Sequence, residues 1–587
     1  MTTPQITVLD AGGQYCHLIA RKIRDLGVYA DVKPSETPAS ELAGRKGIVI
    51  SGGPDSVYEP GSPQIDPRIL SSDSAVLGIC YGQQLMTHVL GGCVRKGDEG
   101  EYGFARFHAF PSKGGPHALF ANLAGDFQVW MNHRDQVQAV PEGFEVIGGT
   151  STCAIAAIAH RTRPLMAVQF HPEVAHTQHG HDILANFVFG VCGCVKDWDP
   201  KDRIGPIEKQ IRAVADGRGV FFFVSGGVDS TVAYSLCLRA LGRERVFGIY
   251  VDTGLMREGE TAYVRRLFAD LGAKDFQVED AEAEFLAALA GVTDPEIKRH
   301  IIGEQFVVVQ ERILSTGHFL DGRWILGQGT IYPDTIESGG TAKADVIKTH
   351  HNRVAGIQKL IESGRLIEPL ASFYKDEVRE IGQELGIPSE FLHRHPFPGP
   401  GLAIRCLCSE SSAPATRRDP GWLLPIRSVG VKGDSRSYHS VLALDNVPED
   451  DIATELVNAM SDINRVVGLV RSEFSITEMR SRAATLTRER LELLRTADAI
   501  VRRLSEESGF DTQVWQFPVV LIPLGVASAP DSVVLRPIHS VDGMTAQVVR
   551  MPDLLMWRIT DALLNEDGVC AVFYDLTHKP PGTIEWE

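Results

Sequence analysis

A cysteine flanked by glycines stands at the end of a predicted buried strand. Residues 78–82 are Gly-Ile-Cys-Tyr-Gly; they follow an apolar run that begins at Ala75, and a helical pattern starts near Gln83. The glycines permit a tight strand-to-helix turn that pushes Cys80 outward, and the N-terminus of the helix favours a thiolate. The motif predicts a nucleophile, although a single cysteine in a turn is more often a buried structural residue.

A histidine and an acid further along the chain can complete this chemistry. His171 and Glu173 lie in the motif Phe-His-Pro-Glu, which follows the apolar run 165–169. A histidine at a strand end can act as general base for Cys80, and Glu173 can orient its imidazole. The motif Ser-Gly-Gly-Pro at 51–54 follows another predicted strand. The backbone N–H groups of Gly53 and Tyr81 are therefore the expected oxyanion hole.

A second glycine turn predicts a phosphate site. It joins the apolar strand Gly219–Val224 to a helix over Thr231–Leu241 and consists of Ser225, Gly226, Gly227, Val228, Asp229 and Ser230. The glycines let the backbone approach phosphate, and the helix N-terminus favours negative charge. Asp252 follows the next predicted strand, Val246–Val251, at the edge where an open sheet presents its ligands. A tight turn with no ligand is the plainer interpretation of glycines alone.

The elements that must position these residues belong to several domains. At ~150 residues a domain, 587 residues indicate roughly three or four. The chain divides into three blocks, which meet near residues 200 and 400. Strands alternate with helices through the first two blocks, which predicts mostly parallel sheets covered on both faces. The third block carries a weak internal repeat: 423–444 and 519–538 each contain two strands around a polar turn, followed by another strand near 464–469 and 569–576. We expect two related α+β units there.

Composition excludes several classes of protein. The net charge is -17, which argues against a surface built for nucleic acid. No apolar stretch approaches the ~20 residues of a membrane helix, and the first residues do not resemble a signal peptide. The 10 cysteines are scattered, as is typical of a reducing compartment. We expect a cytoplasmic protein without nucleic-acid or membrane partners.

The motifs GICYGQQ, SGGP and FHPE, in this order, resemble the class I glutamine amidotransferases over the first ~200 residues. The resemblance implies that Cys80 attacks the side-chain amide of glutamine, releasing ammonia and then glutamate. Residues 130–135 resemble the segment of that family near the glutamine site, which usually contains His-Gly-Asp. Arg134 replaces the glycine here, which leaves the glutamine contacts of this segment open.

The motif SGGVDS resembles the pyrophosphate loop of the N-type ATP pyrophosphatases, and the chain has no GxxxxGK[ST] Walker loop. The resemblance implies that the loop grips the β,γ-pyrophosphate of ATP as a leaving group, so that the substrate becomes adenylylated. Asp252 is followed by Thr-Gly where that family usually has Asn-Gly.

Later segments resemble the GMP synthase family: GQGTIYPD at 327–334, IKTHHN at 347–352, HPFPGPGLAIR at 395–405 and KPPGTIEWE at 579–587. The resemblance, which extends over nearly the whole chain, implies glutamine, ATP with Mg²⁺, and xanthosine monophosphate (XMP) as reactants. XMP is adenylylated and then aminated to GMP. The repeated third block resembles the long form of these enzymes. The short form has one such unit and dimerises through it, so monomer and homodimer are both open.

By this resemblance, several residues fall on substrate-contacting positions. A lid is expected at Lys348, His350 and His351, and the C-terminal tail is expected to dock over the nucleotide. The expected contacts of XMP are Arg299, Asp434, Gln516, Lys579 and Glu585. The expected domains are an amidotransferase at 1–200, a Rossmann-like ATP pyrophosphatase at 201–403, and α+β units at 404–475 and 476–587.

Two other functions are possible on the sequence alone. A different glutamine-dependent enzyme with the same loop, such as an NAD synthetase, would activate a carboxylate. A scaffold protein could retain the fold without activity. The segments HPFPGPGL, IKTHHN and IEWE argue against the first, and the intact Cys80, His171, Glu173 and SGGVDS loop argue against the second.

Overall fold

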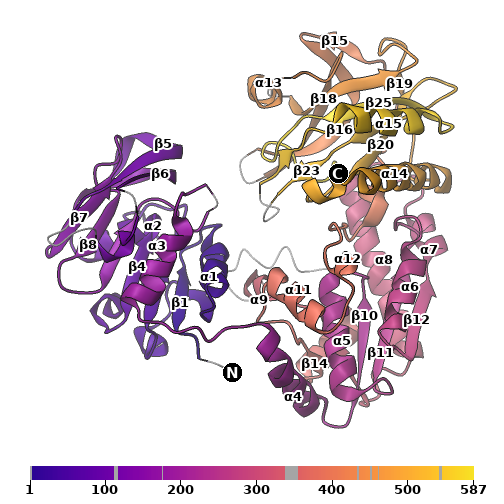
Figure 1. Ribbon diagram of the computed structural model, residues 1–587. Coiled ribbons are helices and arrows are strands. Elements are labelled where there is room, and N and C mark those ends of the chain that lie inside the picture. The colour runs from indigo at the N-terminus through magenta and orange to yellow at the C-terminus, as the bar shows by residue number, and fades with distance from the viewer. Residues whose placement is uncertain are drawn as a thin grey trace. The chain divides into compact units, whose positions relative to one another are not determined.

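The computed structural model describes residues 3–111, 117–123, 125–174, 176–337, 354–432, 435–449, 452–460, 462–540 and 545–587. Within these ranges the chain forms two compact units, Met1–Asp202 and Arg203–Glu587 (Figure 1). Each unit has its own sheets and core. A search of the described helices finds none long and apolar enough to cross a membrane.

The first unit is built on one mixed sheet. Its strand order is β2 (Ala30–Pro34), β1 (Ile6–Asp10), β3 (Gly47–Ile50), β4 (Ala75–Ile79), β9 (Leu165–Val168), β8 (Ala157–His160), β7 (Phe144–Gly149), β5 (Cys93–Ala109) and β6 (Asp126–Ala139). The first five strands pair in parallel. The predicted strands in the regions of β3 and β4 are confirmed, and both, like β1, are buried along nearly their whole length, as their apolar runs require.

A parallel sheet begins the second unit. Its order is β12 (Asp275–Asp280), β11 (Val246–Asp252), β10 (Gly219–Val224), β13 (Trp324–Gly327) and β14 (Leu366–Ile367). All neighbours pair in parallel. The chain turns in opposite directions on the two sides of β10, so the carboxyl end of β10 is a topological switch point, where such sheets bind ligands. Helix α5 (Val228–Leu241) starts there, three residues before the predicted start.

The strands of both repeated segments join one further sheet. It has the order β15 (Thr416–Arg418), β16 (Gly421–Lys432), β17 (Ser435–Leu444), β18 (Ile463–Ser472), β25 (Val569–Asp575), β22 (Asp531–Leu535) and β20 (Val519–Ile522). In each half, two antiparallel strands are followed by a helix, α13 (Ala453–Ala459) or α15 (Asp553–Leu564), and a strand parallel to the second. The halves meet at the antiparallel pair β18 and β25.

The C-terminal tail is docked, as expected. The Trp586 side chain is fully buried, and its indole Nε1 donates to Oδ2 of Asp575 at 2.9 Å. The same carboxylate oxygen lies 2.8 Å from guanidinium nitrogens of Arg465 and Arg536. Burial raises the pKa of Asp575, but the charges of Arg536 and Arg465 outweigh it and hold that pKa below its usual value. The arginines also donate to tail carbonyls, so the tail is part of the fold.

Two candidate active sites

The turn between β4 and helix α2 (Tyr81–Val89) holds Cys80 in a strained conformation. Cys80 has φ 53° and ψ -107°, an arrangement that costs an L-residue about 1–3 kcal/mol and is found mostly at functional sites. A Cβ on Gly82 would lie 2.3 Å from the carbonyl oxygen of Ile50, and one on Gly78 would lie 2.6 Å from that of Gly82. Only glycine fits at these two positions, which explains the spacing of the motif.

His171 and Glu173 form a buried pair beside Cys80. Nδ1 of His171 lies 2.7 Å from Oε1 of Glu173, and both side chains are at most 5% exposed. Gly52 lies against both His171 and Cys80: a Cβ at this position would be 3.1 Å from Cε1 of His171 and 3.6 Å from Cβ of Cys80. Among the described residues Nε2 of His171 has no hydrogen bond, so it is available to the thiol.

Electrostatics favour a charged imidazole at His171. Burial alone lowers the pKa of this histidine, but the carboxylate of Glu173, followed by the Cys80 sulfur, raises it to about 10. An imidazolium next to a thiolate is the activated form of a cysteine nucleophile. The Sγ of Cys80 also lies 3.6 Å from Nε2 of Gln169 and 3.7 Å from the carbonyl oxygen of Asn132.

The expected oxyanion donors directly follow two residues of this site, since Tyr81 comes after Cys80 and Gly53 after Gly52. Tyr81 opens α2, and its amide has no acceptor among the described residues; the same holds for the amide of Gly53. Gly53 is packed closely, because a Cβ there would lie 2.4 Å from the carbonyl oxygen of Ala11 and 3.3 Å from the Tyr81 ring. Two unpartnered N–H groups suit a developing oxyanion.

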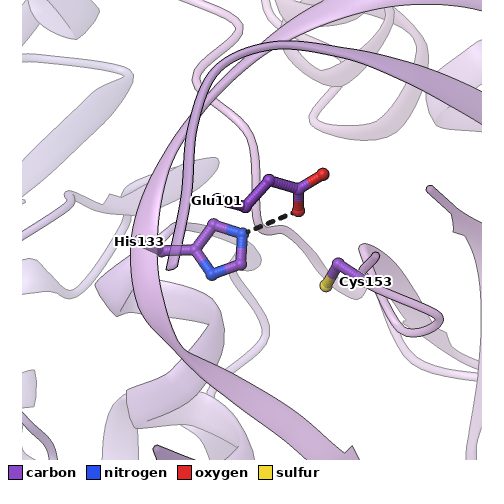
Figure 2. Close-up of side chains that lie close together, drawn as sticks. All are labelled: Glu101, His133 and Cys153. Carbon is purple, nitrogen blue, oxygen red and sulfur yellow. Dashed lines mark hydrogen bonds and ion pairs between the residues drawn. The ribbon is translucent and has the colours of Figure 1, made fainter. Parts of the chain in front are cut away.

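Another cluster of titratable side chains in the first unit was not predicted (Figure 2). Nε2 of His133 lies 3.2 Å from Oε2 of Glu101, and the ligand atoms of Glu101, His133 and Cys153 all lie within 4.8 Å of one another. Nδ1 of His133 contacts a backbone carbonyl at 3.1 Å, and two threonine hydroxyls donate to Oε1 of Glu101. Burial and Glu101 raise the pKa of Cys153 to about 12, which keeps the thiol protonated. We interpret the cluster as a satisfied hydrogen-bonded group and not as a metal centre.

Arg134 lies between the buried residues His133 and Asp135 and is itself exposed. Because side chains alternate along a strand, Arg134 projects from the other face of β6. Arg134 therefore does not contribute its side chain to the buried face that carries His133 and Asp135.

The second candidate site is the turn after β10. Gly226 adopts φ +73°, and its Cβ would collide with Val264 at 2.8 Å. The hydroxyls of Ser225 and Ser230 lie 3.3 Å apart, and each makes one hydrogen bond with the backbone of Gly227. The loop therefore presents hydroxyls and backbone at the start of α5, as phosphate binding requires.

Asp229 contributes a carboxylate to this turn, and its partner Lys375 was not predicted from the sequence. Nζ of Lys375, at the start of helix α11 (Lys375–Glu384), lies 3.3 Å from Oδ2 of Asp229. Oδ1 of Asp229 is buried and has no partner among the described residues. Asp252, at the end of β11, accepts from the amide of Gly254 at 3.0 Å and from the hydroxyl of Thr261 at 2.7 Å. No local motif marks Lys375, which is distant in sequence.

Three of the expected nucleotide contacts lie at or beside the docked tail. Gln516 donates to Glu585 at 3.4 Å, and Arg299 donates to the carbonyl oxygen of Glu587. The Glu585 carboxylate receives two hydrogen bonds from buried Arg405, at 2.9 and 2.7 Å. Arg405 was not among the predicted residues.

The remaining expected contacts are placed less fully. The backbone of Lys579 pairs with that of Ala546, at 2.8 and 3.0 Å, which fixes the start of the tail. Asp434, Lys348, His350 and His351 lie outside the described residues.

Three family models match the chain. They are Glutamine amidotransferase class-I over residues 7–191, NAD synthase over 204–297 and GMP synthase C terminal domain over 504–586. A probable glutamine-hydrolyzing GMP synthase from Leptospira interrogans is 42% identical over 607 residues, which cover 99% of each chain. Glutamine-hydrolyzing GMP synthase from Thermobifida fusca is 38% identical over 602 residues, with 100% of this chain and 98% of that one covered.

Among solved structures, a putative GMP synthase subunit from Thermoplasma acidophilum is 36% identical. It covers 32% of this chain and 93% of its own, with a TM-score of 0.30.

Replacing Glu173 tests the electrostatics of the triad. Because the Glu173 carboxylate raises the pKa of His171 to about 10, the imidazolium persists through neutral pH and is lost only as the pH rises through that value. In E173Q the pKa falls, so the alkaline limb of glutamine hydrolysis moves to lower pH, and kcat/KM falls by about 10²–10⁴-fold. The measurement is the pH profile of glutamate release. Exposed Glu142, changed to Gln, is the control; an unmoved alkaline limb in E173Q contradicts the assignment.

Proposed function

The chain belongs to the family of glutamine-hydrolysing GMP synthases, and on that premise we propose how its residues share the reaction. The enzyme converts XMP into GMP, with glutamine as nitrogen donor and ATP cleaved to AMP and pyrophosphate. The observation that carries the proposal is the presence of both a buried Cys80–His171–Glu173 group and a serine-glycine phosphate turn on one chain. An NAD synthetase is not favoured, because the matching NAD synthase model spans only residues 204–297 while GMP synthases match nearly the full length.

We propose that the first unit hydrolyses glutamine at Cys80. His171 takes the thiol proton, and the thiolate attacks the side-chain amide carbon. The N–H groups of Gly53 and Tyr81 stabilise the oxyanion. His171 then protonates the leaving nitrogen, ammonia departs and a thioester remains. Water, deprotonated by His171, hydrolyses the thioester to glutamate and restores Cys80.

The phosphate turn is proposed to bind ATP. O2 of XMP attacks the α-phosphorus, the bond to the bridging oxygen breaks, and pyrophosphate leaves against the N–H groups and hydroxyls of residues Ser225, Gly226, Gly227, Val228, Asp229 and Ser230. Because Lys375 contacts Asp229, we propose that it holds the same leaving group, with Asp252 at the adjacent strand end. Ammonia then adds at C2 and expels AMP, a better leaving group than the original oxygen.

Asp229 and Asp252 fit a Mg²⁺ ion that accompanies ATP. Oδ1 of Asp229 is a buried carboxylate oxygen without a partner among the described residues, and carboxylates together with phosphate oxygens are the preferred ligands of Mg²⁺. When bound, the ion neutralises charge on the polyphosphate. The residues themselves orient the triphosphate at the carboxyl ends of β10 and β11.

Three of the proposed XMP contacts, Arg299, Gln516 and Glu585, lie at or beside the C-terminal tail. Arg299 and Lys579 suit the phosphate, while Gln516 and Glu585 suit the ribose or the purine edge. Glu585 is prepared for this role because Arg405 fixes its carboxylate. Asp434 and the lid residues Lys348, His350 and His351 are further proposed contacts.

We propose that residues 404–587 are a tandem duplication. The proposed domains are then 1–200, 201–403, 404–475 and 476–587. The same order of strands and helix occurs twice, and the halves pair through β18 and β25. All ten cysteines are free, which supports a cytoplasmic location.

Replacing the nucleophile separates the two reactions. C80A is expected to lose glutamine-driven GMP synthesis by at least about 10³-fold and to keep ammonium-driven synthesis, because only the first unit needs the thiol. GMP, AMP and glutamate are measured with XMP, ATP and Mg²⁺ and either nitrogen source. C93A, which changes a cysteine outside the triad, is the matched control. A wild type that makes no GMP from either source would refute the substrate assignment.

We expect the protein to be a monomer. The edge strands of the seven-stranded sheet are short: β15 has three residues, and β20, which has four, pairs on its outer side with the segment at Cys406 through Leu521. Sedimentation equilibrium should therefore give the mass of one chain over the micromolar range. A stable dimer mass would contradict the expectation that the protein is a monomer.

A further inference from the structure

The segment that follows Asp252 is enclosed although it borders the proposed ATP site. We call residues 253–257 the β11 loop; four of its five residues, all but Met256, are buried. Gly254 has φ +68°, and a Cβ there would lie 2.2 Å from Cγ of Glu282. The carbonyl oxygen of Leu255 accepts from the amide of Leu402 at 2.7 Å. Because the amide of Gly254 donates to Asp252, the position of the loop sets that of the Asp252 carboxylate.

Helix α14 (Arg488–Ser508) holds the β11 loop with two side chains that are one turn apart. The guanidinium of Arg495 donates to the carbonyl oxygen of Gly254 and, at 3.0 Å, to that of Met256. Oδ2 of Asp498, which is fully buried, lies 3.5 Å from Nε of Arg257. The two positions face the loop together because residues three apart share a helix face.

The contacts continue from Arg257 to the C-terminal tail. The Arg257 guanidinium lies 4.4 Å from the ring centroid of Phe397, and that of Arg405 lies 5.2 Å from the same ring. Arg405 in turn donates both hydrogen bonds to Glu585. A chain of direct contacts therefore joins Asp498 on α14, through two cations and one aromatic ring, to the tail.

The buried charges in this chain of contacts are incompletely paired, although Nε of Arg502 also donates to Oδ2 of Asp498 at 2.9 Å. Nε of Arg257, Oδ1 of Asp498 and Nη1 of Arg405 are buried and have no hydrogen bond among the described residues. A buried polar atom without a partner is destabilising, and apolar replacements of buried ion pairs are often neutral or stabilising. Burial lowers the pKa of Arg257 to about 10 even with Asp498 beside it. The arrangement therefore points to a role in the reaction.

We propose that Arg257 and Asp498 are positioning residues that couple nucleotide binding at the tail to ATP binding at the β11 loop. The inference rests on the proposed function, which puts Glu585 beside XMP and Asp252 beside ATP. XMP engages Glu585, which fixes Arg405 and Phe397 and, through the ring, Arg257. Asp498 and Arg495 then hold the loop in the position that presents Asp252. Arg257 and Asp498 act through the loop and need not touch either substrate.

The test compares ATP affinity with and without XMP. The double variant R257M/D498L replaces the pair by apolar side chains of similar size. The probe is ATP with a methylene group in place of the α–β bridging oxygen, which cannot be cleaved there, and its Kd is measured by calorimetry on the full chain. In the wild type XMP should tighten binding within the range of about 5–150-fold typical of coupled sites, and in the variant by less than about 2-fold. Arg503 is an exposed arginine on the same helix, so R503M is the control and should keep the wild-type coupling.

The outcomes distinguish this inference from the proposed function. Full coupling in a folded double variant overturns it, and so does a wild type without coupling. A thermal melt verifies folding; if the double variant does not fold, F397L, which keeps both charges and removes the ring, must lose the coupling instead. Ammonium-driven GMP synthesis by the wild type is measured alongside, because its absence would mean that the proposed function has failed.

Discussion

The carboxylate of Asp575 is shared by Arg465, Arg536 and Trp586, and the end of the chain depends on this buried contact. Asp575 is the last residue of β25, an interior strand of the seven-stranded sheet, so the tail is anchored directly to the sheet. Removing one partner of such a buried group typically costs about 3–5 kcal/mol, because an uncompensated charge is left behind. With the tail held there, Glu585 meets Arg405, and Arg299 meets the terminal residue.

The two proposed reaction centres are built on the same local structure. In each unit a buried parallel strand ends in a glycine turn that opens a helix: β4 leads to Cys80 and α2, and β10 leads to Ser225 and α5. The rigid strand fixes the position, and the helix N-terminus supplies oriented N–H groups. The two turns differ in the groups that they present. The turn after β4 presents the thiol of Cys80, and the turn after β10 presents backbone and hydroxyl groups suited to phosphate.

Short sequence motifs predicted the features that depend on neighbouring residues alone. The strand near β4 and the roles proposed for Cys80 and His171 follow from short motifs, because a glycine-flanked cysteine and a histidine two residues before an acid suit nucleophilic catalysis. The helical pattern predicts a start of α5 at Thr231, three residues after the actual start, because Val228, Asp229 and Ser230 are weak helix formers.

Contacts between residues far apart in sequence were not predictable. Arg405 meets Glu585 across 180 positions and Lys375 meets Asp229 across 146, and no spacing rule connects such pairs. The pairing of Glu101 with His133 is likewise set by the long β5–β6 hairpin. The repeat predicted two α+β units, but the single sheet that joins them depends on β18 pairing with β25, about a hundred residues later.

The most direct measurement follows the nitrogen atom. Glutamine labelled with ¹⁵N in its side-chain amide is supplied with XMP, ATP, Mg²⁺ and a low concentration of unlabelled ammonium, and the GMP formed is examined by mass spectrometry. If the thiol of Cys80 and the phosphate turn serve one reaction, the product is predominantly the heavier GMP, with the label on the C2 amino group. Unlabelled GMP as the main product would contradict the account, because the glutamine amide would then not be the source of the new bond.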